Sequence, residues 1–341
     1  MLEINGSYGE GGGQILRNAV ALATVINKPI KIKNIRANRP NPGIKAQHYV
    51  AIKSIQELCN AETKGLEIGS SKLTFIPGSF KGGDYKFDIG TAGSITLVFQ
   101  ALILASLKTD TKTNIRLTGG TDVKWSPTWD YFQHVFIPII KKTGISVNAQ
   151  LIKRGYYPRG GGEAEITIRP VSEIKSLQLD KETEFSIVNG IVHIAELSNS
   201  ISTRIKNAAI KTLIKSDLQS NIKVEQNPSL SPGTGITLWT ESNDIILGST
   251  VLGEKGLPSE EIGKNAATNL LSEIKSNSTL DIHAFDQLLP YMAIAQGISS
   301  CIVKKISSHA QTNMWLIKRL LGTTFEAKQG ENHIRININK P

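Results

Sequence analysis

Hydrophobic and polar residues follow one another along the chain in an order that predicts a repeated helix-and-strand unit. In the first copy, apolar residues recur at helical spacing from about Gly12 to Ile26, and the alternating run Ile30–Arg36 follows as a strand. A second helix is expected from Pro42-Gly43 to about Leu58, and two short strand-like segments close the copy. Each helix keeps one apolar face, so each should cover one side of a small sheet.

The same order recurs in a second copy. Tyr85–Ile89 is expected to be a strand, and Gly90–Ser94 opens a helix behind it. A strand at Asn114–Thr118 precedes a further helix, which Ser126-Pro127 should open and which should run to about Lys142. Two more strands follow, so the second copy also reads strand, helix, strand, helix, strand, strand.

A third copy is expected near the C-terminus. Its first strand is predicted at Thr279–His283 and its first helix at Asp286–Ser299. A strand at Cys301–Ile306 leads into a helix at Ser308–Leu321, and two short strands close the copy. The three copies predict an α/β (α+β) fold, in which three repeated two-helix, four-strand units form one large domain.

A segment of different order separates the second copy from the third. It carries a helical pattern at Ile201–Lys215, a hairpin signal at Asn243-Asp244 and a helix start at Pro258. Polar, turn-like residues flank the segment, as is typical of an insertion site. We therefore predict a large domain of residues 1–176 and 279–341 and a smaller inserted α/β domain of residues 177–278.

Composition narrows the class of protein. The chain has 341 residues, and its 39 Lys and Arg against 29 Asp and Glu give a net charge of +10, which favours an anionic partner such as nucleic acid or a nucleotide. Two cysteines do not make a disulfide scaffold or a cysteine-based metal site. We find no signal-peptide pattern and no membrane-spanning apolar run, so we expect a cytoplasmic protein without membrane contact.

The segment Ser307–Asn313 carries the first candidate for chemistry. Serine before the apolar run that follows is a helix N-cap signal, so His309 should lie in the first helical turn. Free amide groups and the helix dipole there favour an anionic ligand and disfavour the imidazolium form. A neutral imidazole beside a phosphate can act as a nucleophile. The alternative is a helix-cap histidine that only packs.

Three glycines before the first helix carry the second candidate. The run Gly9–Arg17 permits close approach of a phosphate or an RNA backbone. Glu10 would repel a bare phosphate, but it suits a site in which a divalent cation lies between the two. Arg17 follows one helical turn after Gly13 and should face the same mouth. A simple tight turn is the alternative.

Two further segments combine arginine with turn residues. Arg39 leaves a strand just before a helix whose first turns hold Gln47 and His48, a setting that suits phosphate oxygens. Arg159 lies in the stretch Arg154–Glu163, which contains three consecutive glycines. Ordering three glycines costs more conformational entropy than an ordinary hairpin loop requires, so this stretch favours a functional role. A solvated basic loop and a long hairpin loop, respectively, are the alternatives.

Taken together, the motifs resemble the RNA 3′-terminal phosphate cyclase family. The stretch Arg154–Gly162 is similar to the family signature, and Gly9–Gln14, Pro42–His48 and Ser307–Asn313 match further motifs. Gly256-Leu257-Pro258 in the inserted segment also resembles the family. The matches occur in order along essentially the whole chain, which is more specific than any single glycine loop.

The resemblance implies a reaction and a mechanism. Members of this family use ATP and a divalent cation, here Mg²⁺ or Mn²⁺, to convert an RNA 3′-terminal phosphate to a 2′,3′-cyclic phosphate. A histidine becomes covalently adenylated in the enzymes, and His309 matches its position. A branch that acts in ribosome biogenesis lacks this histidine and does not cyclise. A non-catalytic RNA-binding factor of that kind is the alternative, and an enolpyruvyl transferase of related architecture is a second one.

The resemblance also implies roles for individual residues, and it is compatible with a homo-oligomer. His283 stands where the family is expected to have an aromatic neighbour of adenine, so its role departs from the pattern. The residues are His309 as the catalytic nucleophile; Arg17, Arg39, Gln47, His48 and Arg159 as RNA and phosphate ligands; Gln100, Pro127, His283, Asp286 and Gln287 as nucleotide ligands; and Glu10 as the metal ligand.

Overall fold

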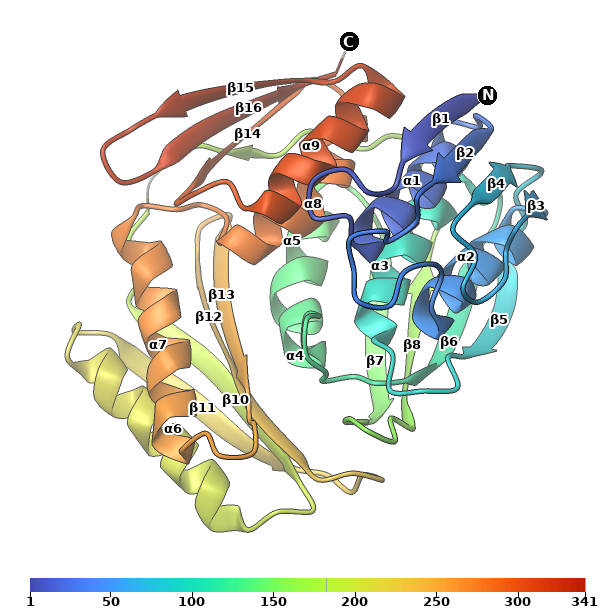
Figure 1. The fold of residues 1–341 in the computed structure, drawn as a ribbon. Helices are drawn as coiled ribbons and strands as arrows, with labels where there is room; N and C mark the ends of the chain where they lie inside the picture. Colours follow the sequence, from blue (N-terminus) through green and yellow to red (C-terminus); the bar gives the residue numbers. More distant parts are fainter. Residues whose placement is uncertain (182, 341) are drawn as a thin grey trace.

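The computed structural model describes residues 1–181 and 183–340, and four four-stranded sheets pack around a central group of helices in this part of the chain (Figure 1). The first sheet has the strand order β1-β2-β4-β3, and the helices α1 and α2 accompany it. Its elements are β1 (Leu2–Asn5), α1 (Gly13–Val25), β2 (Ile30–Lys33), α2 (Ala46–Leu58), β3 (Glu62–Lys64) and β4 (Leu73–Ile76).

The second sheet has the order β5-β6-β8-β7. Its second helical segment contains a π-helical stretch, a local widening that occurs often at functional sites. The elements are β5 (Gly83–Asp88), α3 (Ile95–Ala105), the 3₁₀ turn η1 (Ser106–Lys108), β6 (Thr113–Gly119), α4 (Trp129–Tyr131), the π segment η2 (Phe132–Phe136), α5 (Ile137–Lys142), β7 (Val147–Lys153) and β8 (Gly162–Ile168).

The remaining two sheets differ in how they are built. The third has the order β15-β16-β14-β9 and belongs with α8 and α9, whereas the fourth, β11-β10-β12-β13, packs against α6 and α7 (Figure 1). The elements are β9 (Gln178–Leu179), β10 (Ile187–Ala195), α6 (Asn199–Ile214), β11 (Gln219–Gln226), β12 (Gly233–Ser242), β13 (Ile245–Leu252), α7 (Ser259–Lys275), α8 (Ile282–Ile294), β14 (Ile298–Val303), α9 (Ser308–Leu321), β15 (Thr324–Gln329) and β16 (Ile334–Asn339).

The predicted α+β fold class is confirmed. The first three sheets share one pattern: their first two strands pair in parallel, and the fourth strand pairs antiparallel with both the second and the third. The fourth sheet lacks this pattern, because its third strand, β12, pairs antiparallel with both β10 and β13. Helices α1, α3, α8 and α9 pack on one another between the sheets, which brings helix starts from different units together (Figure 1).

The predicted strand at Thr279–His283 is wrong. Asp281 caps a helix instead, since its Oδ1 accepts the backbone N–H groups of His283 and Ala284 at 3.0 Å each. The first strand of the third sheet comes from the other side of the inserted segment, where β9 pairs in parallel with β14. A division of the chain at residue 177 would separate this strand from its sheet.

The helix predicted at Asp286–Ser299 is also displaced, because α8 spans Ile282–Ile294. Two other predicted helix starts are displaced in the opposite direction. Pro42-Gly43 does not open a helix, because Gly43 has a φ of +77° and α2 begins only at Ala46. Ser126-Pro127 precedes the helical segment by two residues, because Thr128 is the N-cap and its side chain accepts the N–H of Tyr131. Proline and glycine mark a change of direction in both places, but the capping side chain decides where the helix begins.

Two groups of buried apolar residues stabilise the fold. The larger group joins the first three sheets and their helices, and the smaller joins the fourth sheet with α6 and α7. Apolar side chains removed from water stabilise each group by roughly 25 cal/mol per Å². Among the described residues, no helix combines the length and the apolar character that crossing a membrane requires.

A buried ionic network around Arg154 connects the two groups. Its guanidinium, 1% exposed, lies 3.2 Å from Asp122 Oδ2, 2.8 Å from Asp130 Oδ1 and 2.9 Å from Glu225 Oε2. Glu225 is on β11 and the other three residues precede the inserted segment, so the network fixes the fourth sheet to the second. Removing one partner of such a buried network leaves an uncompensated charge, which is strongly destabilising.

The same network contains the group of described residues that comes closest to a metal site, namely Asp122, Asp130 and His193. Arg154 already supplies a positive charge to the two carboxylates. His193 is buried, and burial lowers its pKa to about 4, so its ring is neutral at pH 7. We therefore interpret this cluster as structural.

Candidate active site

His309 lies in the first turn of α9, as predicted, because Ser307 caps the helix. The Oγ of Ser307 accepts the N–H of Ala310 at 2.9 Å and donates to Asp286 Oδ1 at 2.6 Å. Asn313, one turn further along, donates to the carbonyl of Asp286 at 2.9 Å. These contacts fix the start of α9 against α8, so the position of the imidazole is set by two helices.

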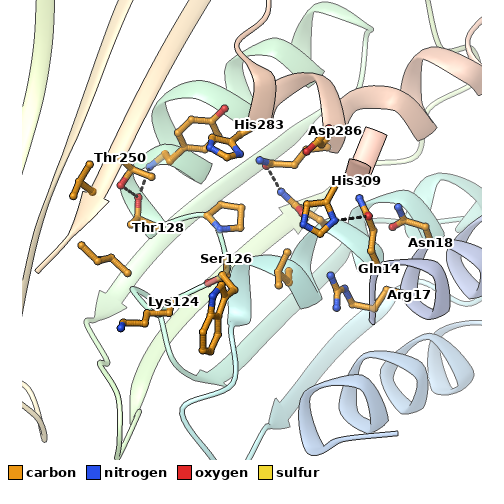
Figure 2. Close-up of a pocket in the computed structure, with 18 of the residues that line it drawn as sticks. Gln14, Arg17, Asn18, Lys124, Ser126, Thr128, Thr250, His283, Asp286 and His309 are labelled. Atoms are coloured by element: carbon orange, nitrogen blue, oxygen red, sulfur yellow. Dashed lines mark hydrogen bonds between the residues drawn. The ribbon is translucent and has the colours of Figure 1, made fainter. Parts of the chain in front are cut away.

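The ring of His309 is oriented by the glycine loop at the start of α1. Its Nδ1 lies 2.9 Å from Glu10 Oε2 and 3.1 Å from Gln14 Oε1. The contact with Gln14 is drawn in Figure 2. Both partners are acceptors, so Nδ1 carries the proton in the neutral ring. The other nitrogen, Nε2, then keeps its lone pair, which is the form a nucleophile requires.

The surroundings keep this imidazole neutral. Burial lowers the pKa of His309 below its usual 6.5, and the charges of Arg39 and Arg17 lower it further, while Glu10 opposes them. The helix dipole at the start of α9 acts in the same direction as burial. At pH 7 the ring is therefore predominantly uncharged, although its side chain is half exposed.

A pocket of about 550 Å³ opens in front of His309. All five predicted nucleotide ligands line it together with Arg17, and Figure 2 shows His283, Asp286 and Arg17 around its wall. The volume lies within the range of small-molecule sites. The predicted nucleotide ligands come from three separate segments of the chain, and the structure brings them to a single cavity. These ligands are Gln100, Pro127, His283, Asp286 and Gln287.

Hydrogen bonds between the units order this wall. Gln100 on α3 donates to Gln287 on α8, and the hydroxyl of Tyr291 donates to the carbonyl of Gln100 at 3.0 Å. Burial raises the pKa of Asp286 to about 7, although its hydrogen bond from Ser307 opposes the shift. The pocket therefore combines ordered amides with a carboxyl that is easily protonated.

The predicted phosphate ligands fall into an inner and an outer set. Arg17 is buried at the pocket wall, where burial lowers its pKa to about 10, and it forms no ion pair among the described residues. An unpaired buried cation facing a cavity suits an anionic ligand. Arg39 contacts Glu10 Oε2 at 3.4 Å, which places it beside His309 rather than in the pocket lining.

Of the other three predicted phosphate ligands, two have structural contacts and the third lies outside the pocket. Gln47 accepts the N–H of Ser94 at 2.9 Å and so joins the first unit to the second. His48 is buried and neutral, with its pKa lowered to about 3 by burial, and its Nδ1 accepts the N–H of Lys45. Arg159 is exposed on the loop between β7 and β8, and it does not line the pocket.

His48 explains one glycine of the N-terminal loop. A Cβ on Gly13 would lie 1.9 Å from His48 Nε2, so any side chain there would displace the imidazole. The glycine loop therefore serves the packing of α1 on α2 as well as the approach to Glu10. The sequence pattern alone predicted access for a phosphate or an RNA backbone, with a tight turn as the alternative, and gave no sign of this packing.

Glu10 fits a divalent cation in one arrangement only. It supplies one carboxylate, whose oxygens contact His309, Arg39 and Ser308, and the described residues offer no acidic cluster beside it. Mg²⁺ is commonly held by one or two carboxylates together with substrate phosphates and water. The residues present fit a cation that arrives with a phosphate ligand.

Sequence reasoning missed the part of the pocket that the inserted segment forms. Residues of β13 and the turn behind it complete the wall opposite α8, and Thr128 bonds to Thr250 across this boundary at 3.1 Å (Figure 2). The one available signal was the family-like stretch Gly256-Leu257-Pro258. The lining residues of this segment that were missed are Thr250, Val251, Leu252, Glu254 and Leu257.

Comparison with known proteins gives a consistent result. A family model described as RNA 3′-terminal phosphate cyclase matches residues 8–327. Curated relatives with the same name are 44% identical in Pyrococcus furiosus, over 97% of this chain and 96% of that protein, and 42% identical in Methanopyrus kandleri, over 97% of each. A relative from Nitrosospira multiformis is 39% identical over 98% of this chain and 96% of its own length.

A solved structure is only distantly similar. The enolpyruvyl transferase NikO from Streptomyces tendae matches with a TM-score of 0.39 and 9% sequence identity, over 98% of this chain and 47% of that one. Similarity at this level supports no conclusion about activity.

Proposed function

This chain belongs to the RNA 3′-terminal phosphate cyclase family and is an enzyme of that family, and from this premise we propose that it works through a covalent His309–AMP intermediate formed from ATP. The observation that carries the proposal is the orientation of His309. Its protonated Nδ1 faces two acceptors, and its Nε2 has no hydrogen-bond partner among the described residues, in a neutral ring at the edge of a nucleotide-sized pocket.

The first step would be attack of His309 Nε2 on the α-phosphorus of ATP. A nitrogen–phosphorus bond forms, the bond to the bridging oxygen breaks, and pyrophosphate leaves with that electron pair. The ring gains a positive charge, which the carboxylate of Glu10 at Nδ1 stabilises, in the manner of the carboxylate that orients a catalytic histidine elsewhere.

The second and third steps would activate and close the RNA end. An oxygen of the 3′-terminal phosphate attacks the histidine-bound phosphorus, so AMP passes to the RNA and neutral His309 is restored. The adjacent 2′-hydroxyl then attacks the adenylated phosphate, losing its proton, and AMP leaves. Activation is needed because a phosphate monoester has no good leaving group, and the neighbouring hydroxyl makes closure intramolecular.

Different pocket residues would bind the nucleoside and the phosphates. Gln100, Asp286 and Gln287 would hold the nucleoside, with Pro127 and His283 on its flanks. Arg17 and Arg39 would hold phosphates, because both are cations close enough to His309 to lower its pKa.

Three predicted ligands and the cation complete the proposal. Gln47 and His48 would position the glycine loop, and Arg159 would contact RNA outside the pocket. A divalent cation held by Glu10 together with the ATP phosphates would neutralise their charge and make pyrophosphate a better leaving group.

The test uses an RNA oligonucleotide with a labelled 3′-terminal phosphate, together with ATP and Mg²⁺ or Mn²⁺. Wild-type protein should make the label resistant to phosphatase, and omission of ATP should prevent this. His309→Ala should lose the activity, whereas His333→Ala, a matched change of a partly exposed histidine on the β15–β16 turn, should retain it. A protein that binds the RNA without protecting its phosphate would support a non-catalytic RNA-binding role instead.

A further inference from the structure

Trp125 is the most exposed large apolar side chain of the described residues, at 95%. It lies in the loop between β6 and α4, and it belongs to the lining of the pocket in front of His309. Its backbone has a φ of +61°, in the left-handed region that bulky residues rarely adopt. Trp125 thus combines an exposed indole with a strained backbone beside the candidate site. Such strain is typical of functional positions, which indicates a role of this residue in binding.

The loop is held on both sides of the tryptophan. Ser126 Oγ donates to the carbonyl of Val123 at 2.8 Å, and Thr96 Oγ1 donates to the carbonyl of Pro127 at 2.8 Å. Lys124 forms an ion pair of 2.7 Å with Glu254 of the inserted segment. The indole is therefore presented to solvent by an anchored turn and not by a loose one.

The other three tryptophans are satisfied within the protein. Trp129 is buried and packs on Phe99 and Phe132, Trp239 stacks on His134, and Trp315 stacks on Tyr8. Among the described residues, Trp125 alone of the four has no aromatic ring partner. Its two faces are free for an aromatic ligand.

Charge and position indicate which ligand. Arg17 lines the same pocket as Trp125 and forms no ion pair among the described residues, whereas Lys124 is already paired with Glu254. The lining therefore offers an unpaired cation and an exposed aromatic ring, which suits a molecule with both phosphate and aromatic groups. The residues proposed to hold the nucleoside through hydrogen bonds lie on α3 and α8, and Pro127 of the Trp125 loop would only flank it. Trp125 itself is almost fully exposed, so its indole can meet an RNA end that approaches from solvent. Unpaired RNA bases commonly stack on exposed aromatic side chains, and such stacking tolerates any base.

We propose that Trp125 stacks on the terminal nucleobase of the RNA and so positions its 3′-phosphate in front of His309. The inference rests on the proposed function, because it assigns the RNA and ATP to separate parts of one pocket. It makes Trp125 a positioning residue for the RNA and leaves the adenylation of His309 independent of it. It also predicts that the enzyme accepts all four terminal bases.

The experiment compares wild type, Trp125→Ala and Trp125→Phe in two assays. Trp125→Ala should raise KM for a 3′-phosphate RNA about 10- to 100-fold, the effect expected for loss of one base–aromatic stack. Self-adenylation with ATP alone should stay within about twofold of wild type, and Trp125→Phe should recover most of the RNA affinity. Ile214→Ala, which removes another exposed apolar side chain far along α6, should change neither assay.

An abasic substrate makes the test specific. An RNA whose terminal ribose carries the 3′-phosphate but no base should bind wild type and Trp125→Ala equally well, measured by fluorescence anisotropy without ATP. The inference is overturned if Trp125→Ala weakens binding of the normal and the abasic RNA alike. It is also overturned if the difference between wild type and Trp125→Ala disappears only when the penultimate base is removed, or if self-adenylation falls together with RNA use.

The binding assay also separates this inference from the proposed function. If wild type binds 3′-phosphate RNA with the expected dependence on Trp125 and on the terminal base, stacking is supported even where no cyclic phosphate forms. If cyclisation proceeds and Trp125→Ala behaves as wild type with every RNA, the function stands and the stacking role is overturned.

Discussion

His309 and Arg154 both lie in segments that resemble family motifs, but their surroundings differ in every physical respect. Around Arg154 the guanidinium is buried with Asp122 and Asp130, and it pairs with a third carboxylate, that of the partly exposed Glu225. Around His309 the ring is half exposed, and its contacts come from a glycine loop and a helix start that face a pocket. Residues of the same types, an arginine, a histidine and carboxylates, are present in both.

The two sites differ in role: the Arg154 network stabilises the fold, and the His309 pocket is the candidate site of the reaction. In the Arg154 network a missing partner leaves a buried charge without compensation, so the network holds the inserted segment on the rest of the protein. In the His309 pocket, neither Arg17 nor the Nε2 of His309 has an ion-pair or hydrogen-bond partner among the described residues, which is the arrangement that the proposed phosphate ligand would complete. A motif can therefore be diagnostic of a family and still act at a distance from the reaction.

The largest effect that we expect is on the free energy of unfolding, when Arg154 is replaced. Arg154→Met should lower the free energy of unfolding by about 3–5 kcal/mol, since Asp122 and Asp130 would remain buried without a cation. Urea denaturation measures it. Arg159→Ala, on the exposed loop of the same segment, should change stability by less than about 0.5 kcal/mol. Equal losses in the two variants would contradict the structural role given to Arg154.

The next effect concerns Glu10 and the cation. Glu10→Gln keeps an oxygen that can accept from His309 Nδ1 but removes the charge, so adenylation should require about 10- to 100-fold more Mg²⁺. The rate of self-adenylation against Mg²⁺ concentration measures this shift. Glu10→Ala removes the oxygen as well and should not recover at any Mg²⁺ concentration. An unchanged Mg²⁺ dependence in Glu10→Gln would leave Glu10 as an orienting residue only.

The smallest expected effect is on the pKa of His309. Burial and Arg39 lower it in the folded protein, so the neutral form should persist as the pH falls through 6.5, and protonation should follow only below that value. In Glu10→Gln the pKa should fall further, because Glu10 raises it. Titration of the imidazole by NMR, assigned with His309→Ala, measures both values. A pKa above 6.5 in wild type would contradict the neutral nucleophile.

Much of the site was predictable where the signal is local. Helix α9 begins and ends as expected because Ser307 caps its start and Gly322, with a φ of +75°, ends it. The position of His309 in its first turn follows directly. Local capping and turn chemistry determine these features, and both are legible in a single sequence.

The features that were missed depend on contacts between distant segments. Strand β9 has two residues and pairs with β14, more than a hundred residues later, so no local pattern identifies it. The inserted segment contributes Thr250 and Leu257 to the pocket only after its sheet docks on the second unit. The ion pair between Lys124, next to Trp125, and Glu254 also joins two segments that are distant in the sequence.

The most direct test of the account is to locate the covalent adenylate. The protein is incubated with ATP labelled at the α-phosphate and Mg²⁺ and then digested at alkaline pH, where a histidine phosphoramidate survives, and the labelled peptide is sequenced by mass spectrometry. The account predicts AMP on the peptide that contains His309, lost on acid treatment and absent from a folded His309→Ala variant. AMP on another residue, or equal label in the variant, would contradict it.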